Sequence, residues 1–172
     1  MNVSTDYAIT QYLLKTLSDL KVRIIHNMEA AGQVVSGKTK DSMQIISDQP
    51  NQARLMARGY FAALETGSQP WKYTHIKYRK DGSTFPSAPR WFIDIIDQWI
   101  RDKGLTLNSW AVATKIMTDG SSLYRSGGRK DIFSVEIAKT MQDLGVEVAH
   151  LYEREVDNLF KEGQYRTTYP NQ

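Results

Sequence analysis

The chain has 172 residues, 41% of them hydrophobic and 24% charged, and its formal net charge is +3. This balance is typical of one folded soluble domain, and its mild basicity does not by itself indicate nucleic-acid binding. The absence of cysteine excludes disulfides, thiol catalysis and Cys-ligated zinc, and no apolar run is long enough to span a bilayer.

A long amphipathic helix is predicted over about residues 5–31. Ser4 or Thr5 can cap its start, and Gly32 can end it. Apolar residues recur at spacings of three and four, which places them on one face. They are Ile9, Leu13, Leu17, Leu20, Ile24 and Met28. We expect most of this stripe to pack on the core of the domain; the alternative is that part of it packs on a neighbouring subunit.

A β-hairpin is predicted next. Residues 42–46 have β-branched content, residues 48–52 have turn chemistry, and residues 53–58 alternate between apolar and mostly basic side chains. These features predict a small antiparallel sheet after the first helix. Residues 60–65 fit either one helical turn or a continued strand, and the pattern leaves both open.

Residues 67–89 form a long connection that is rich in glycine and proline. An extended segment over residues 72–80 and a turn at Asp81-Gly82 are favoured within it. Five Lys or Arg side chains lie between Lys72 and Arg90, and only Asp81 opposes them. A connection of this length in a compact domain usually has a function or is partly disordered.

The remainder of the chain is predicted to be mainly helical. We expect helices over residues 89–103, 110–117 and 131–161, with a loop over residues 121–130. Gly145 costs the last helix about 1 kcal/mol relative to alanine, which favours a kink or break there. The apolar residues in register on the 89–103 helix are Phe92, Ile95, Ile96, Trp99 and Ile100. Those of the last helix are Phe133, Ile137, Met141, Leu144, Val148, Leu151, Tyr152, Val156 and Leu159.

The predicted fold class is therefore α+β, with a long N-terminal helix, a small antiparallel sheet and a C-terminal helical part. One domain is expected over residues 1–162, followed by a polar C-terminal tail over residues 163–172.

No catalytic or metal-binding signature accompanies these elements. None of His26, His75 and His150 has a second ligand at metal-binding spacing. The Gly- and Ser-rich segments around residues 120–130 lack the spacing of a phosphate-binding loop, and no G-x-S-x-G motif is present. We therefore predict no catalytic residue, no metal and no cofactor; a small enzyme with an unrecognised site is the alternative.

Several short segments carry a resemblance to a known family. They include a small-residue turn near Ser36-Gly37, an aromatic-plus-Glu-Gly element at residues 60–67, and the stretches at residues 99–105 and 110–116. Their order between about residues 30 and 160, completed by Gly120 and Ile132-Phe133, resembles the neck or tail-completion proteins of long-tailed bacteriophages.

This resemblance implies an α+β subunit of a homo-oligomeric ring that joins the portal or adaptor to the tail proteins. It implies a virion protein assembled in the host cytoplasm, with no catalysis, cofactor or membrane. Genomic DNA would pass the ring nonspecifically, since no recognition-helix pattern for base contacts appears. The Lys-rich loop over residues 71–86 and the tail after Gly163 depart from the family pattern.

Subunit contacts are expected where aromatic and basic side chains lie outside any periodic face. The candidates are Trp71, Tyr73, Lys77, Tyr78, Arg79, Lys80, Tyr124, Arg125, Arg129, Lys130, Tyr165 and Tyr169. Gly67 is predicted to satisfy a backbone requirement for positive φ. For Glu65 we favour a bond to loop backbone donors or a nearby Arg over an exposed carboxylate. The alternative function is a non-catalytic nucleic-acid-binding protein that uses the basic loops 72–90 and 125–130.

Overall fold

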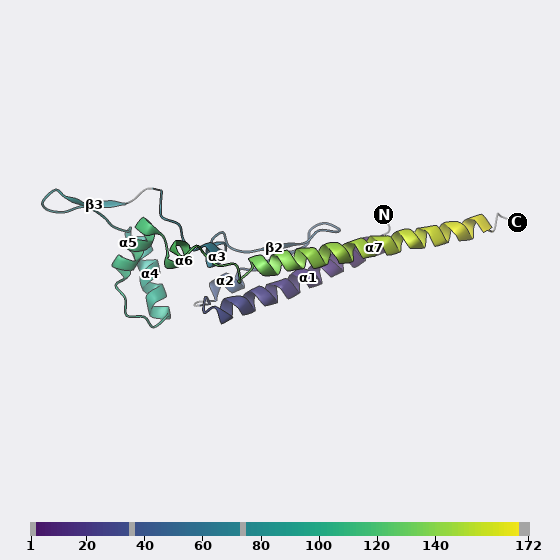
Figure 1. The fold of residues 1–172 in the computed structure, drawn as a ribbon, viewed down its shortest axis with the longest axis horizontal. Helices are drawn as coiled ribbons and strands as arrows, with labels where there is room; N and C mark the ends of the chain where they lie inside the picture. Colours follow the sequence, from purple (N-terminus) through teal and green to yellow (C-terminus); the bar gives the residue numbers. More distant parts are fainter. Residues whose placement is uncertain (1–2, 35–36, 73–74, 169–172) are drawn as a thin grey trace.

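The computed structural model describes residues 3–34, 37–72 and 75–168, with side chains described from residue 6 to residue 161 within those ranges. The fold is α+β, as the sequence predicts: a long N-terminal helix, small antiparallel strand pairs and C-terminal helices. The molecule is elongated (Figure 1). Two long helices form a rod, and a group of shorter elements lies at one end of it.

The rod consists of α1 (Val3–Ala30) and α7 (Ser134–Thr168), which run antiparallel. The apolar stripe predicted for the first helix faces this packing, and Leu20, Ile24 and Met28 are buried there with Met43 and Ile132. Polar contacts add to it, because Arg23 donates to Glu136 and to Thr140 at 2.8 Å each. The expectation that most of the stripe packs on the core is confirmed.

Helix α7 differs from its prediction at three points. It begins at Ser134, runs without a break through Gly145, and continues to Thr168. The predicted break at Gly145 is therefore wrong, since helix formation and packing along α1 outweigh a glycine cost of about 1 kcal/mol. The predicted end of this helix at residue 161 is wrong, because residues 163–168 are also helical; residues 169–172 lie outside the described residues.

The first sheet follows a short helix, α2 (Lys38–Asp41). Strands β1 (Gln44–Ile46) and β2 (Arg54–Met56) pair antiparallel as a hairpin, as predicted, though each is shorter than the pattern suggested. For residues 60–65 the sequence left a helical turn and a continued strand open, and the structure shows a helical turn, α3 (Ala63–Thr66).

The elements at the end of the rod begin with an antiparallel hairpin of β3 (Ile76–Tyr78) and β4 (Thr84–Pro86). It continues with α4 (Arg90–Asp102), α5 (Ser109–Asp119) and α6 (Ser122–Arg125). The helices α4 and α5 match their predictions to within about two residues, whereas the sequence pattern did not reveal β4 and α6. Their buried residues are Ala88, Ile96, Ile100, Ala113 and Met117.

The described residues thus hold two buried apolar clusters, one in the rod and one between α4 and α5. A polar contact links the two: Lys103, after the end of α4, donates to the carbonyl oxygen of Gly32, which follows α1. The single domain over residues 1–162 stays a prediction.

Candidate functional site

Two segments that are distant in sequence meet where the rod joins the second cluster. Ser121 donates its N–H to the carbonyl oxygen of Ser68 at 2.8 Å, and Arg129 donates its N–H to that of Glu65 at 2.8 Å. Backbone pairing of this kind holds the chain without needing particular side chains. We refer to the two segments, residues 65–71 and 117–134, as the junction.

Glu65 occupies the centre of the junction and is only 3% exposed. One carboxylate oxygen accepts the N–H groups of Ile132 at 2.9 Å, Phe133 at 2.7 Å and Ser134 at 3.0 Å. The other accepts the Ser134 hydroxyl. The first N–H groups of a helix have no partner within the helix, and its N-terminus favours negative charge. Glu65 therefore caps α7 from a remote part of the chain.

The environment of Glu65 has opposing effects on its pKa. Burial raises the pKa of the carboxyl, whereas the hydrogen bonds from the Ser134 side chain and from three backbone N–H groups lower it. The net pKa lies below the ordinary value, so Glu65 is a charged cap at neutral pH. Of the alternatives that the sequence left open, the structure shows bonds to backbone donors.

Gly67 has φ 71° and ψ 179°, which lies outside both helix and strand. A Cβ at this position would lie 2.4 Å from the Tyr124 backbone nitrogen and 2.5 Å from the Ser121 hydroxyl oxygen. Gly120, with φ 81°, is equally confined, since its Cβ would lie 2.9 Å from the carbonyl oxygen of Ser68. The junction therefore requires glycine for backbone conformation and for close approach.

The aromatic candidates have different surroundings. Trp71 stacks on Trp91 with ring centroids 5.6 Å apart, and its ring centroid lies 5.1 Å from that of Phe92, so Trp71 is partly buried against α4; its role in a subunit contact stays a prediction. Tyr78 is 79% exposed and Tyr124 is 39% exposed. Tyr73 and Tyr169 lie outside the described residues, and Tyr165 lies in the part of α7 whose side chains are not described.

The basic candidates of the β3–β4 hairpin are all exposed. They are Lys77, Arg79 and Lys80. The hairpin turn is ordered, because Asp81 accepts the N–H of Ser83 at 2.9 Å and its hydroxyl at 2.6 Å. At the base, Trp110 donates to the Ser87 hydroxyl at 3.0 Å. The hairpin is a preorganised basic arm at one end of the molecule (Figure 1).

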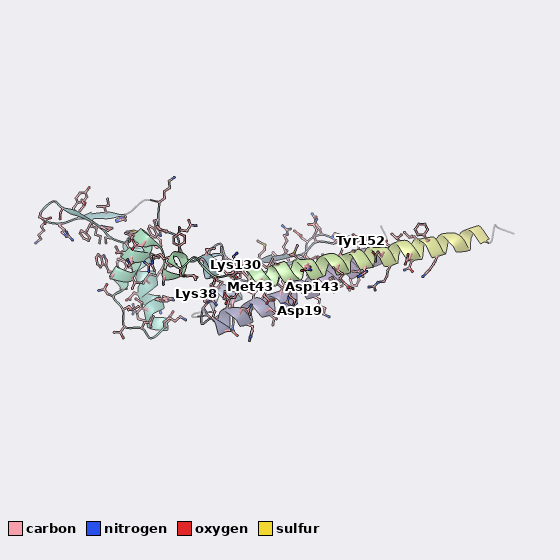
Figure 2. All side chains as sticks on the ribbon, viewed as in Figure 1. Asp19, Lys38, Met43, Lys130, Asp143 and Tyr152 are labelled. Carbon is pink, nitrogen blue, oxygen red and sulfur yellow. The ribbon has the colours of Figure 1, made fainter. Side chains whose placement is uncertain are left out.

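The other basic segment is partly neutralised by nearby carboxylates. Arg129 makes two hydrogen bonds of 2.6 Å to Asp131, and Arg125 lies 3.9 Å from Asp119. Lys130 is exposed near the start of α7, away from the β3–β4 hairpin (Figure 2). Lys130 and the basic residues of the hairpin therefore lie on separate parts of the surface.

Replacing Asp131 with asparagine is expected to flatten the acid limb of the stability curve. The Arg129 guanidinium lowers the pKa of Asp131 to about 2 from its ordinary 3.8, so this ion pair stabilises the fold above about pH 4 and loses its effect as the pH falls toward 2. Urea midpoints between pH 2 and 7 measure this change, with Asp143→Asn as the control. Identical acid limbs for wild type and Asp131→Asn would contradict it.

A groove of about 740 Å³ opens between α4, α5 and α6 beside the junction. Its apolar lining includes Ile95, which is 56% exposed, and Trp99, which is 39% exposed. The apolar stripe predicted for α4 therefore divides by exposure: Ile96 and Ile100 are buried, whereas Ile95 and Trp99 are exposed at the groove. Sequence reasoning missed this groove, although the unusual width of the stripe is a signal for it.

The apolar residues predicted to share one face of α7 also differ in exposure. Leu144, Val148 and Leu151 are half-buried, whereas Met141 and Tyr152 are 62% and 37% exposed. The last part of α7 extends past the start of α1 (Figure 1), and Figure 2 labels Tyr152 on this helix. One stripe in the sequence thus corresponds to two helix faces, of which only one is covered by α1.

Comparison of the chain with protein-family models, curated proteins and solved structures finds no match. Within the described ranges, no three His, Asp or Glu side chains are grouped so that they could hold a metal ion. In the same part of the chain, no helix combines the length and the apolarity needed to cross a membrane.

Proposed function

We propose that this chain is a structural subunit of a tailed bacteriophage particle. In this proposal it forms a homo-oligomeric ring at the head–tail neck or tail end, joins the portal or adaptor to the tail proteins, and lines the path of the genomic DNA. The short segments that resemble neck and tail-completion proteins support the phage context. The shape and surface of the chain support the role of an assembly subunit.

The observation that carries the proposal is an excess of surface. The chain, of 19.7 kDa, has an accessible surface of 12251 Å². A compact monomer of this mass is expected to have about 8,600 Å². The difference, roughly 3,600 Å², is comparable to the area that obligate subunit interfaces bury. A chain of this kind gains much of its apolar burial by associating with other chains.

The character of the exposed side chains agrees with this interpretation. Among the described residues, 22 large apolar side chains are exposed, whereas 11 apolar residues are buried. Isolated exposed apolar residues are common on monomers, but larger groups of them mark interaction sites. Eight of the 22 lie on α7, and two more, Ile95 and Trp99, line the groove beside α4.

The test is to locate the chain in the phage particle that encodes it. Cryo-electron microscopy of the purified particle is expected to show several copies in a ring on the head–tail axis. Mass spectrometry of the same particles measures the copy number independently. Absence of the chain from intact particles, or its presence only in the capsid shell, would overturn the proposal.

The second candidate function is nucleic-acid binding, and the exposed basic hairpin favours it. The two functions differ in solution: a nucleic-acid-binding protein is expected to bind free duplex DNA with a steep dependence on salt. Tight, sequence-selective binding of a short duplex at physiological salt would favour this second function over the neck proposal.

Neutralising the arm by Lys77→Ser, Arg79→Ser and Lys80→Ser together is expected to leave the fold intact. These side chains are exposed at the end of the molecule, and surface changes usually alter stability by less than about 0.5 kcal/mol. In the particle, altered DNA retention or ejection would place the arm at the channel, and blocked head–tail joining would place it against a protein neighbour. Unchanged infectivity and assembly would contradict both roles.

A further inference from the structure

Charge is distributed unevenly along the long axis of the molecule. Residues 63–130, which include the arm and the groove, hold 11 Lys and Arg against 6 Asp and Glu. Helix α7, residues 134–168, holds 4 Lys and Arg against 7 Asp and Glu. The arm and the C-terminal end of α7 lie at opposite ends (Figure 1). Two copies that meet head to tail would therefore bring opposite charges together.

The last part of α7 extends past the start of α1 (Figure 1), and we call its residues 153–161 the projecting segment. This segment has the side-chain pattern of a helix that binds in a groove. Val156, Leu159 and Phe160 stand at positions i, i+3 and i+4, the spacing by which amphipathic helices anchor in apolar grooves. Their exposures are 47%, 58% and 68%. Glu153 and Asp157, exposed residues of the same segment, supply negative charge beside these anchors.

The groove beside α4 has the complementary properties. Its wall includes Ile95, Trp99 and Ile116, and its volume of about 740 Å³ is large enough to accept side chains from a helix. Lys115 and Arg125 line it as well. These two cations share one carboxylate, that of Asp119, so the rim keeps an excess of positive charge.

We propose that the projecting segment of α7 in one copy docks in this groove of a second copy. The segment and the groove of one chain lie toward opposite ends of the molecule (Figure 1), so a chain cannot fill its own groove. The contact joins two different surfaces of the subunit, and where the rotation between successive copies closes, its repetition around an axis forms a ring. This inference rests on the proposed function, since it assigns the surfaces through which the ring subunits associate.

Disulfide trapping tests this contact, because the chain contains no cysteine. Lys161→Cys places a thiol beside the anchors without removing them, and Ser122→Cys places one at the groove. Mixing the two full-length variants, one with a mass tag, is expected to yield at least about tenfold more cross-linked heterodimer than the control pair, since docking raises the local thiol concentration. The control pair is Lys161→Cys with Ser18→Cys, a second exposed serine, on α1. Equal yields would overturn the inference.

Removing the anchors provides an independent measurement. The double change Leu159→Ala and Phe160→Ala is expected to weaken self-association about 30-fold, as truncation of central apolar anchors commonly does. The change Val22→Ala, at an exposed position of α1, is the control and is expected to have no effect. Equal association constants for the double variant and wild type, from sedimentation, would also overturn the inference.

The two proposals can fail separately. If particles contain the ring but the cross-link does not exceed its control, the docking inference fails and the neck function stands. If the cross-link forms efficiently but the chain is missing from particles, docking stands and the neck function fails.

Discussion

Replacing Glu65 with alanine is expected to lower the free energy of unfolding by about 3 kcal/mol. The buried carboxylate accepts three backbone N–H groups and one hydroxyl at the start of α7, and alanine leaves all four donors without it. Buried donors without partners cost more than the lost bonds alone. For a chain of this size we expect the melting temperature to fall by roughly 6–12 °C.

Thermal and urea unfolding monitored by circular dichroism measure this effect. Glu65→Gln is the matched variant, because it keeps an acceptor of the same shape without the charge, and we expect it to lose about half as much stability. A loss below about 0.5 kcal/mol for Glu65→Ala would show that the cap is dispensable.

The same carboxylate predicts a pH dependence of stability. Since hydrogen bonds hold the pKa of Glu65 below its ordinary value of 4.5, the cap stabilises the fold fully above about that pH. Its contribution is lost as the pH falls through the lowered, folded-state pKa. The difference in stability between wild type and Glu65→Gln should therefore shrink in acid, and a difference that is constant from pH 7 to pH 2 would contradict this account.

Replacing Gly67 with alanine is expected to lower the free energy of unfolding by about 4 kcal/mol or to prevent folding. The added Cβ would meet the Tyr124 backbone nitrogen at 2.4 Å, and the φ of 71° with ψ of 179° is strained for any L residue. The Tyr124 backbone cannot rotate away from the added methyl group as a flexible side chain can. The two junction segments must therefore move apart.

The matched control is Gly82→Ala in the β3–β4 turn. Gly82 also has a positive φ, 80°, but its Cβ would meet nothing within 4 Å. Gly82→Ala therefore measures the cost of a positive φ alone, about 1 kcal/mol of stability, without a steric clash. Expression yield and urea midpoints of both variants give the comparison, and equal losses at the two positions would contradict the steric account.

Both substitutions bear on assembly as well as on stability. Gly67 and Ser121 belong to the junction and also line the groove, whereas Glu65 fixes the start of α7. The junction thus positions both the groove and the start of α7, the helix that we propose to dock in the groove of a second copy. A junction variant that still folds is expected to associate more weakly than wild type.

Much of the architecture could be predicted from the sequence by local rules. The spacing of Ile9, Leu20, Ile24 and Met28 determines which face of α1 is buried, because the helical period alone places them together. Asn108 determines the start of α5, where its side chain accepts the N–H of Ala111 at 2.9 Å. The β1–β2 hairpin follows from alternation and turn chemistry in the same way.

What only the tertiary structure decided concerns contacts between distant segments. Apolar spacing placed Leu144 and Tyr152 in one register, but the position of α1 decides that the first is half-buried and the second exposed. The sequence indicated a role for Glu65, yet its partners at Ile132 to Ser134 depend on the crossing of the two junction segments. Periodicity describes each helix alone, and which face is covered depends on where the rest of the chain packs.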